Sequence, residues 1–284
     1  MMKNKLILLL ALFSIFLSVK AQGDSLQQNR YVMHSRMYGI GSTNILDTYL
    51  SPLEYKGTNI NMLRENMRFT KIMGGKVSAQ NMLQMNFSYS NNRAETSSEI
   101  TYMMKWTYAL HYQLKFGNNL KILFGPMADV NGGFIYNTGN SNNPAQAKAY
   151  ANIDASGMII YKFRLFNYPI IARYQANVPL IGLMFSPDYG ESYYQMFSLH
   201  NFSGKNIVFT SLHNQPSLMQ LLTLDFPIRK SNIRVGYLMN IDQAKVNGLK
   251  SHIWNHSFMV GIVKNFYLLK GKNKVSMPNN VTPY

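Results

Sequence analysis

Cysteine is absent from the 284-residue chain, and acidic residues are few. Without cysteine there are no structural disulfides, and a lipoprotein anchor, which is built on an acylated cysteine, is excluded. After residue 21 no run of about 18 apolar residues occurs, so no transmembrane helix is expected. The 12 Asp and Glu stand against 28 Lys and Arg, a formal net charge of +16. Because no basic helix or cluster accompanies this charge, a phosphate-rich lipid surface is favoured over nucleic acid as the anionic neighbour.

The first 21 residues have the pattern of a secretory signal peptide. Lys3 and Lys5 precede an apolar stretch over residues 6–19, and Val19 and Ala21 supply small residues before a cleavage site. The stretch is shorter than the roughly 20 residues of a membrane-spanning helix. We therefore expect residues 1–21 to be removed and residues 22–284 to form a single domain, with a short basic tail over 267–284.

Strict alternation over residues 99–116 is the most informative pattern in the chain. Even positions from Ile100 to Phe116 are apolar or aromatic, and odd positions from Glu99 to Lys115 are mostly polar. Alternate side chains of a strand point to opposite faces. A strand this long exceeds the usual five or six residues of soluble sheets and suits a tilted membrane strand, which needs roughly 9–11 residues in hydrocarbon.

The same alternation recurs along the rest of the chain. It covers residues 76–88, 120–136, 149–165, 169–180, 232–242 and 253–266, and it is weaker over residues 31–70. Between these segments we expect short turns at 73–76, 117–119, 167–169 and 229–232, and longer polar loops at 90–98, 137–148, 186–193 and 244–251. Short turns on one side and long loops on the other are typical of an outer-membrane barrel, with the short turns in the periplasm.

The predicted fold is therefore an all-β, antiparallel transmembrane β-barrel. Twelve strands are favoured if residues 193–202 and 205–213 pair with each other, and ten result if the stretch over 193–216 is one external excursion. Both counts are even, as single-chain bacterial barrels require. A closed barrel satisfies every strand edge in lipid.

Aromatic residues near the strand ends favour this barrel over a soluble β-sandwich. A soluble sheet also alternates, but its apolar face is an interior, whereas aromatic girdles mark both interfaces of a membrane. The lipid-facing girdle is predicted to include Tyr102, Trp106, Tyr112, Phe116, Tyr136, Tyr161, Trp254 and Phe266.

If the apolar faces meet lipid, the charged residues of the strands line the lumen and sort by depth. Acidic residues fall toward the external strand ends and basic residues toward the periplasmic ends. One interpretation is a network of paired charges that fills the lumen, and another is a narrow pathway with an anion-favouring inner mouth. The predicted lumen residues are Glu99, Lys105, Lys115, Asp129, Asp154, Lys162, Arg164, Arg173, Arg234 and Asp242.

A lipid hydrolase is the alternative function. Nucleophilic catalysis needs a hydroxyl beside a base that a third group orients. In the 186–217 region, the candidates are His200 with Ser203, and His213 with Ser211 or Ser217 and with Asn214 as the third group. The spacing differs from the His-x-Ser arrangement of outer-membrane phospholipases. No metal site or cofactor is predicted.

Two stretches resemble an uncharacterised barrel family of Gram-negative bacteria, a domain of unknown function. They are Tyr38-Gly39-Ile40-Gly41-Ser42-Thr43-Asn44 with Leu50-Ser51-Pro52-Leu53-Glu54-Tyr55, and Asn214-Gln215-Pro216-Ser217-Leu218 with Leu224-Asp225-Phe226-Pro227. The resemblance covers nearly all of residues 22–284 and implies fold and location, but no catalytic residue.

The expected protein is an integral outer-membrane barrel with a structural role or limited passive passage of small solutes. Its expected partners are outer-membrane lipid, lipopolysaccharide and the barrel-insertion machinery, with no nucleic acid. The sequence leaves the oligomeric state open.

Overall fold

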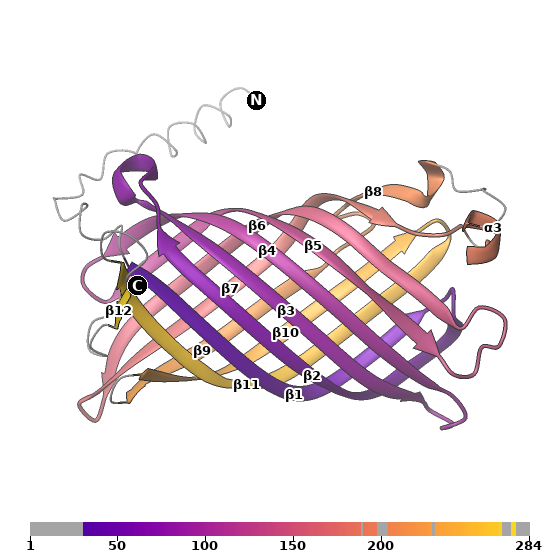
Figure 1. Cartoon of the computed structure of the whole chain (residues 1–284), viewed down its shortest axis with the longest axis horizontal. Coiled ribbons are helices and arrows are strands. Elements are labelled where there is room, and N and C mark those ends of the chain that lie inside the picture. Colours follow the sequence, from indigo (N-terminus) through magenta and orange to yellow (C-terminus); the bar gives the residue numbers. More distant parts are fainter. Residues whose placement is uncertain (1–30, 189, 198–203, 229–230, 269–273, 277–284) are drawn as a thin grey trace, which may run out of the picture.

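Ten long strands form the wall of a closed barrel (Figure 1). A computed structural model describes residues 31–188, 190–197, 204–228, 231–268 and 274–276. Each wall strand pairs antiparallel with its neighbour, and pairing of the first with the last closes the wall. These strands are β1 (Tyr31–Asp47), β2 (Ser51–Phe69), β3 (Val77–Asn92), β4 (Ser98–Phe116), β5 (Leu120–Asn137), β6 (Ala145–Leu165), β7 (Tyr168–Phe185), β9 (Leu218–Ile228), β10 (Ser231–Val246) and β11 (Leu249–Leu268).

The remaining described elements are short and lie at the barrel ends. β8 (Ile207–Ser211) pairs only with the end of β7, and β12 (Lys274–Ser276) pairs with the end of β11. A five-residue helix, α3 (Tyr193–Phe197), and two 3-10 turns, η2 (Ile72–Gly75) and η3 (Gly204–Asn206), complete them. Within the described residues, no helix has the length and apolar character to cross a membrane. The expected signal peptide, residues 1–21, lies outside the described residues.

The strand count is ten, the smaller of the two predicted values, and the favoured count of twelve is corrected. Between β7 and β9 the described residues of 186–217 contain α3, η3 and β8, and β9 pairs directly with β7. We call 186–217 the excursion. The expected pairing of 193–202 with 205–213 does not build the wall, because β8 lies alongside β7 instead.

The connections are mostly short at one end, with 70–76 as the exception. The longest connection lies at the other end, which also has the short connections 48–50 and 247–248. The terminal end is defined here as the end where β1 begins and β11 stops, and the loop end is the opposite one. At the terminal end β4 and β5 are joined by 117–119, and β6 and β7 by 166–167. At the loop end lie 93–97, 138–144 and the 186–217 excursion.

The long loop expected over residues 244–251 is wrong. β10 and β11 continue to a two-residue turn at Asn247 and Gly248, whose φ values are 50° and 72°. Positive φ at both central residues is the geometry of a type I′ hairpin, and Asn-Gly is its preferred sequence. This local signal, rather than the polarity of the segment, determines the connection.

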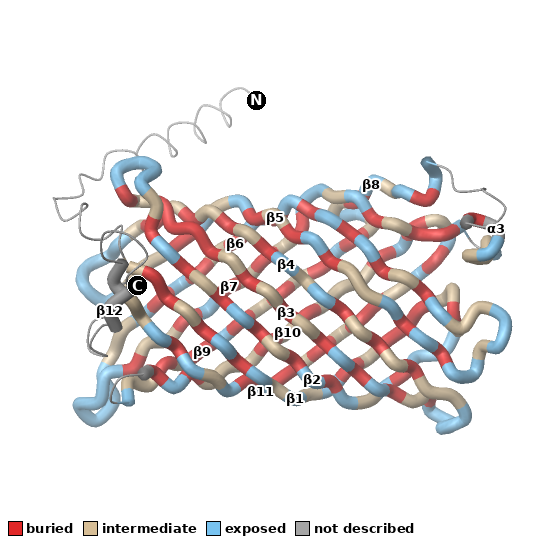
Figure 2. Tube along the Cα trace, viewed as in Figure 1, coloured by how far each residue is buried: buried red, intermediate tan, exposed pale blue. Residues whose placement is uncertain are grey.

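Along each strand, buried residues alternate with more exposed ones (Figure 2). Buried positions are rich in Asn, Gln, Ser and Met, whereas large apolar side chains such as Ile40, Ile60 and Phe258 are exposed on the outside. A soluble barrel has the opposite arrangement. A polar interior with an apolar exterior is the distribution of a membrane barrel, and the wall strands, 11 to 21 residues long, are long enough to span one.

Candidate functional site

The lumen is filled by alternating polar and apolar layers. On β2 the inward side chains run in order from Phe69 and Met67 through Glu65, Leu63 and the asparagines to Tyr55, and all are buried. Inward residues of the other strands continue each layer around the wall. The candidate site is therefore the stack of layers inside the barrel rather than a surface cleft.

A four-residue ion-pair cluster crosses the lumen in the half nearer the terminal end. Glu65 on β2 receives two bonds from Arg173 on β7, with Nη2–Oε1 at 2.6 Å and Nη1–Oε2 at 2.9 Å. Arg234 on β10 donates to Glu65 Oε2 at 2.9 Å and to both oxygens of Asp225 on β9 at 2.6 and 2.7 Å. The two arginines balance the two carboxylates. We call these four residues the plug.

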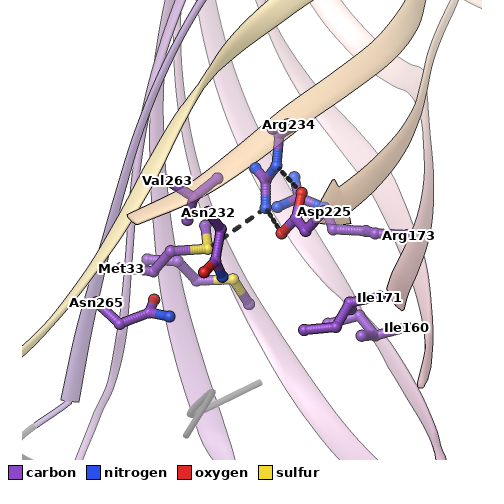
Figure 3. A pocket seen from close by; sticks show the side chains of 10 residues that line it. Met33, Ile160, Ile171, Arg173, Asp225, Asn232, Arg234, Val263 and Asn265 are labelled. Atoms are coloured by element: carbon purple, nitrogen blue, oxygen red, sulfur yellow. Dashed lines mark hydrogen bonds and ion pairs between the residues drawn. The ribbon is translucent and has the colours of Figure 1, made fainter. Parts of the chain in front are cut away.

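The plug is fully enclosed. Glu65 is 1% exposed and Arg234 is 2% exposed. In Figure 3 the Arg234 guanidinium faces the Asp225 carboxylate, and Met33 and Ile171 lie below it in this view. Bidentate pairing of arginine with carboxylate is strong and directional, and a balanced, hydrogen-bonded pair is the form in which buried charge is tolerated.

A chain of amides and hydroxyls extends the plug toward β3, β4 and β6. Gln80 donates to Glu65 at 2.6 Å and exchanges two bonds with Gln175, each 2.9 Å long. Gln175 donates to Asn177, which accepts from Ser156, whose hydroxyl also contacts His111 Nε2 at 2.8 Å. Seven wall strands therefore contribute to one hydrogen-bonded partition.

A second charged cluster lies nearer the loop end. Lys105 Nζ is 3.6 Å from Asp129 Oδ2 and 3.9 Å from Asp242 Oδ1, and Asp154 is buried on β6 beside the same layer. Asn131 donates to Asp129 at 2.9 Å. One lysine thus lies among three carboxylates that the sequence had placed in the lumen.

An apolar layer rich in methionine separates the two charged clusters. Unbranched Met side chains fill irregular gaps between strands. Met37, Met82, Met127, Met219 and Met259 come from five strands around the wall and pack with Leu63, Ala109, Leu221 and Leu238.

The loop end is closed by a third set of contacts. Lys148 Nζ lies 2.6 Å from Asp47 Oδ2, and Asn137 donates to both Glu99 and the Tyr55 hydroxyl at 2.9 Å. Tyr193 of α3 covers this set and donates to Gln146 at 2.9 Å. Burial raises the pKa of the Tyr193 hydroxyl, so it stays protonated as a donor.

The cavities that line the lumen are small. Three of them, one beside the plug, one beside Lys105 and one near the loop end, are each about 20 Å³, about one water-sized probe. They lie between layers of buried side chains, which fill the lumen at these levels.

The structure places the sequence-derived lumen residues in two environments. Seven of them, Glu99, Lys105, Asp129, Asp154, Arg173, Arg234 and Asp242, are inside the wall within the layers above. The other three are half-buried or exposed and lie among the last residues of β4 and β6, at the terminal end. They are Lys115, Lys162 and Arg164.

The aromatic residues expected in the girdle all lie at outward positions of their strands. Phe116 and Phe266 are near the terminal end, and Tyr136 and Trp254 are toward the loop end. Trp106 is in the middle of β4, away from both ends, because alternation assigns a face but not a depth.

In the part of the chain that the structure describes, the hydrolase candidates do not assemble into a catalytic triad. His200 and Ser203 lie outside the described residues. Ser217 donates to the Gln243 carbonyl and accepts from the Gln243 amide, so its partners are backbone groups of β10. His213 contacts Ser211, the other serine expected beside it.

Asn214, the third group expected for His213, does not orient it as a base in the described part of the chain. The Asn214 side chain accepts from the Ser211 amide and donates to the Phe209 carbonyl, so it closes the turn. In the described part of the chain, no three His, Asp or Glu residues gather as metal ligands.

Sequence reasoning missed four members of the lumen network: Glu65, Asp225, Asp47 and Lys148. Glu65 falls in the weakly alternating 31–70 region, where outward positions are also polar, so polarity alone could not assign its face. The available signal is its position in the alternation. Glu65 lies two residues from Leu63 and from Met67, so it shares their face of the strand.

Residues 6–273 match the family described as protein of unknown function (DUF3316). The chain belongs to this family. No match was found among curated proteins.

Solved structures with a similar fold are outer-membrane and autotransporter barrels. The transport unit of the autotransporter AIDA-I from Escherichia coli has a TM-score of 0.50 at 7% identity, with 89% of this chain and 94% of that chain covered. The outer membrane protease OmpT from Escherichia coli has a TM-score of 0.42 at 8% identity, with 83% and 96% covered. An outer membrane channel from Pseudomonas putida F1 has a TM-score of 0.38 at 9% identity, with 87% and 100% covered.

At these identities the similarity shows the fold alone. This DUF3316 chain has the β-barrel fold of outer-membrane proteins.

Proposed function

We propose that this DUF3316 protein is a sealed barrel that serves the outer membrane structurally and carries the 186–217 excursion, and that it is neither an open pore nor an enzyme. The main observation behind the proposal is that Glu65 on β2 forms ion pairs across the lumen with Arg173 on β7 and Arg234 on β10. Apolar layers on both sides of the plug exclude water, and ions cross a membrane only along a hydrated or coordinating path.

The surroundings of the two histidine–serine pairs support a non-catalytic role. The buried His111–Ser156 pair is sealed inside the lumen, where no substrate reaches it. The exposed Ser211–His213 pair lacks an orienting group, because Asn214 is engaged with backbone. Catalysis of acyl transfer depends on that third group.

The proposed topology places the terminal end in the periplasm and the loop end outside the cell. A chain that enters from the periplasm and forms an even number of strands has both barrel termini on that side. The proposal includes cleavage of residues 1–21 and insertion by the barrel-insertion machinery, with lipid and lipopolysaccharide as the surrounding partners.

Conductance in planar lipid bilayers tests the sealed lumen. We expect the wild-type barrel to give no stepwise conductance, because no hydrated path joins its ends. A water-filled porin reconstituted in the same bilayers is the positive control, which shows that the assay detects an open lumen.

Sustained conductance by the folded wild type would refute the sealed barrel in favour of solute passage. The same protein in phospholipid vesicles should release no lysophospholipid. Release that is lost on Ser211→Ala or Ser217→Ala would refute the non-enzymatic proposal.

A further inference from the structure

The outer wall carries a group of cations near the terminal end. Four cations occupy outward, exposed positions: Arg36 on β1, Arg64 and Arg68 on β2, and Lys264 on β11. The three arginines lie between buried chain neighbours, and Lys264 lies between buried Val263 and half-buried Asn265. These three strands are adjacent across the seam that closes the barrel. We call the four residues the cationic patch.

The register brings like charges together. Arg36 lies directly opposite Arg64 in the β1–β2 pair. Arg36 faces Ile262 in the β1–β11 pair, and Lys264 lies two residues further along β11, opposite His34. Like charges directly opposite each other destabilise a sheet. A like-charge pair that costs stability, with Arg68 and Lys264 on the same outer face of the adjoining strands, indicates an anionic partner.

No acidic side chain of the barrel balances the patch. Among the outward positions of the described strands, Glu54 is the only acidic residue, and it lies toward the loop end, 3.9 Å from Lys56. The acidic residues of the plug, Glu65 and Asp225, point into the lumen, where Arg173 and Arg234 neutralise them.

The apolar belt is narrow where the patch lies. On β4 every outward residue from Ile100 to Phe116 is apolar or aromatic. On β1 the outward residues Tyr38 and Ile40 are flanked by Arg36 and Ser42, and β2 is similarly narrow. Charges on the lipid face are tolerated near the interfaces and costly at the midplane, so the headgroup region reaches further along this side of the barrel.

A depression in the wall gives the patch a binding volume. It measures about 650 Å³, and its lining combines Arg36, Arg64 and Lys264 with the rings of Tyr38 and Phe266. His34 and Asn66 form a hydrogen bond on its floor. The exposed Ile262 also lines the depression, and the exposed Ile40 lies beyond it toward the middle of the belt.

We propose that this depression binds the phosphate of an anionic phospholipid from the periplasmic leaflet. Arginine forks match phosphate oxygens in a bidentate manner, and the acyl chains would lie along Ile40 and Ile262. The proposal depends on the membrane topology proposed above but not on the sealed lumen, so it stands even if the barrel conducts.

Native mass spectrometry of the full barrel, released from detergent with phosphatidylglycerol, tests the site. The test variant is Arg36→Gln/Arg64→Gln, and the matched control is Lys56→Gln/Lys250→Gln, which removes two outward cations at the loop end. Each cation near a lipid surface contributes about fivefold, so the test variant is expected to retain phosphatidylglycerol about 30-fold more weakly. The control is expected to bind as the wild type does.

Two further arms identify the source of the phosphate and confirm folding. Inorganic phosphate at millimolar concentration should not displace the lipid, because the acyl chains contribute to binding. Both variants should keep the wild-type shift between heated and unheated gel mobility.

Equal retention by wild type and test variant would overturn the proposal, as would an equal loss in the control. Displacement by inorganic phosphate would overturn the lipid as occupant. Unchanged lipid retention with failed assembly into membranes would likewise overturn it, in favour of a contact with the insertion machinery.

Discussion

At the scale of single residues, Glu65 links several strands of the plug and its surroundings. Its two oxygens accept from Arg173, Arg234 and Gln80, so its carboxylate connects β2 to three other strands. Removal of one member of a buried ion pair leaves its partners charged and unpaired, which costs more than the pair itself contributes.

We therefore expect Glu65→Gln to destabilise the barrel by about 3–5 kcal/mol. Urea unfolding in lipid vesicles, followed by the fluorescence of Trp106 and Trp254, measures the change. The matched control is Glu54→Gln, which breaks the exposed pair with Lys56 and should cost no more than about 1 kcal/mol. A Glu65 effect as small as that of Glu54 would mean that the plug does not stabilise the fold.

At the scale of elements, closure of the barrel depends on the approach of β1 to β11. Gly41 lies on β1 opposite Ser257 in that pair. A Cβ at Gly41 would lie 1.7 Å from the His256 carbonyl oxygen and 2.7 Å from Ser257 Cα. Both atoms belong to the backbone, so the neighbouring strand cannot yield without loss of pairing.

Gly41→Val is expected to prevent the seam from forming, so that most of the protein loses its folded, heat-sensitive band on unheated gels. Overpacking within a core costs about 1–3 kcal/mol, and a clash with backbone at the closing pair costs more. Ser42→Val, one position along the same strand and outward-facing, should fold as the wild type does. Normal folding of Gly41→Val would show that β1 and β11 are further apart than described.

At the scale of the whole molecule, the stacked layers and the two unequal ends give the barrel a direction. Short connections join the strands at the terminal end, and the covered mouth with Tyr193 and the 186–217 excursion lies at the loop end. The cationic patch is near the terminal end only. Function therefore depends on which end faces the cell exterior.

The absence of cysteine makes this topology directly measurable by single-cysteine labelling. Asn142→Cys in the 138–144 loop should react with an impermeant maleimide on intact cells. Asn118→Cys in the 117–119 turn should react only after the outer membrane is permeabilised. The opposite pattern would invert the topology, and an intact mass that includes residues 1–21 would contradict cleavage before Gln22.

The sequence by itself determined the strands and the faces of most of them. Alternation has a period of two residues and depends on nearest neighbours in the chain, so the segments at 99–116 and 149–165 predicted β4 and β6 within a few residues. Their outward apolar residues followed from the same period. The turn at Asn247-Gly248 also had a local signal, which the polarity of its surroundings obscured.

Only the tertiary structure decided the strand count and the pairing of charges. In the closed barrel β7 pairs with β9, so residues 186–217 contribute no strand to the wall. No local pattern in the sequence distinguishes that stretch from a pair of wall strands. Glu65 and Arg173 are 108 residues apart, and Glu65 and Arg234 are 169 apart. Their contact depends on the register of every strand between them, because barrel closure, not sequence proximity, determines which inward side chains share a layer.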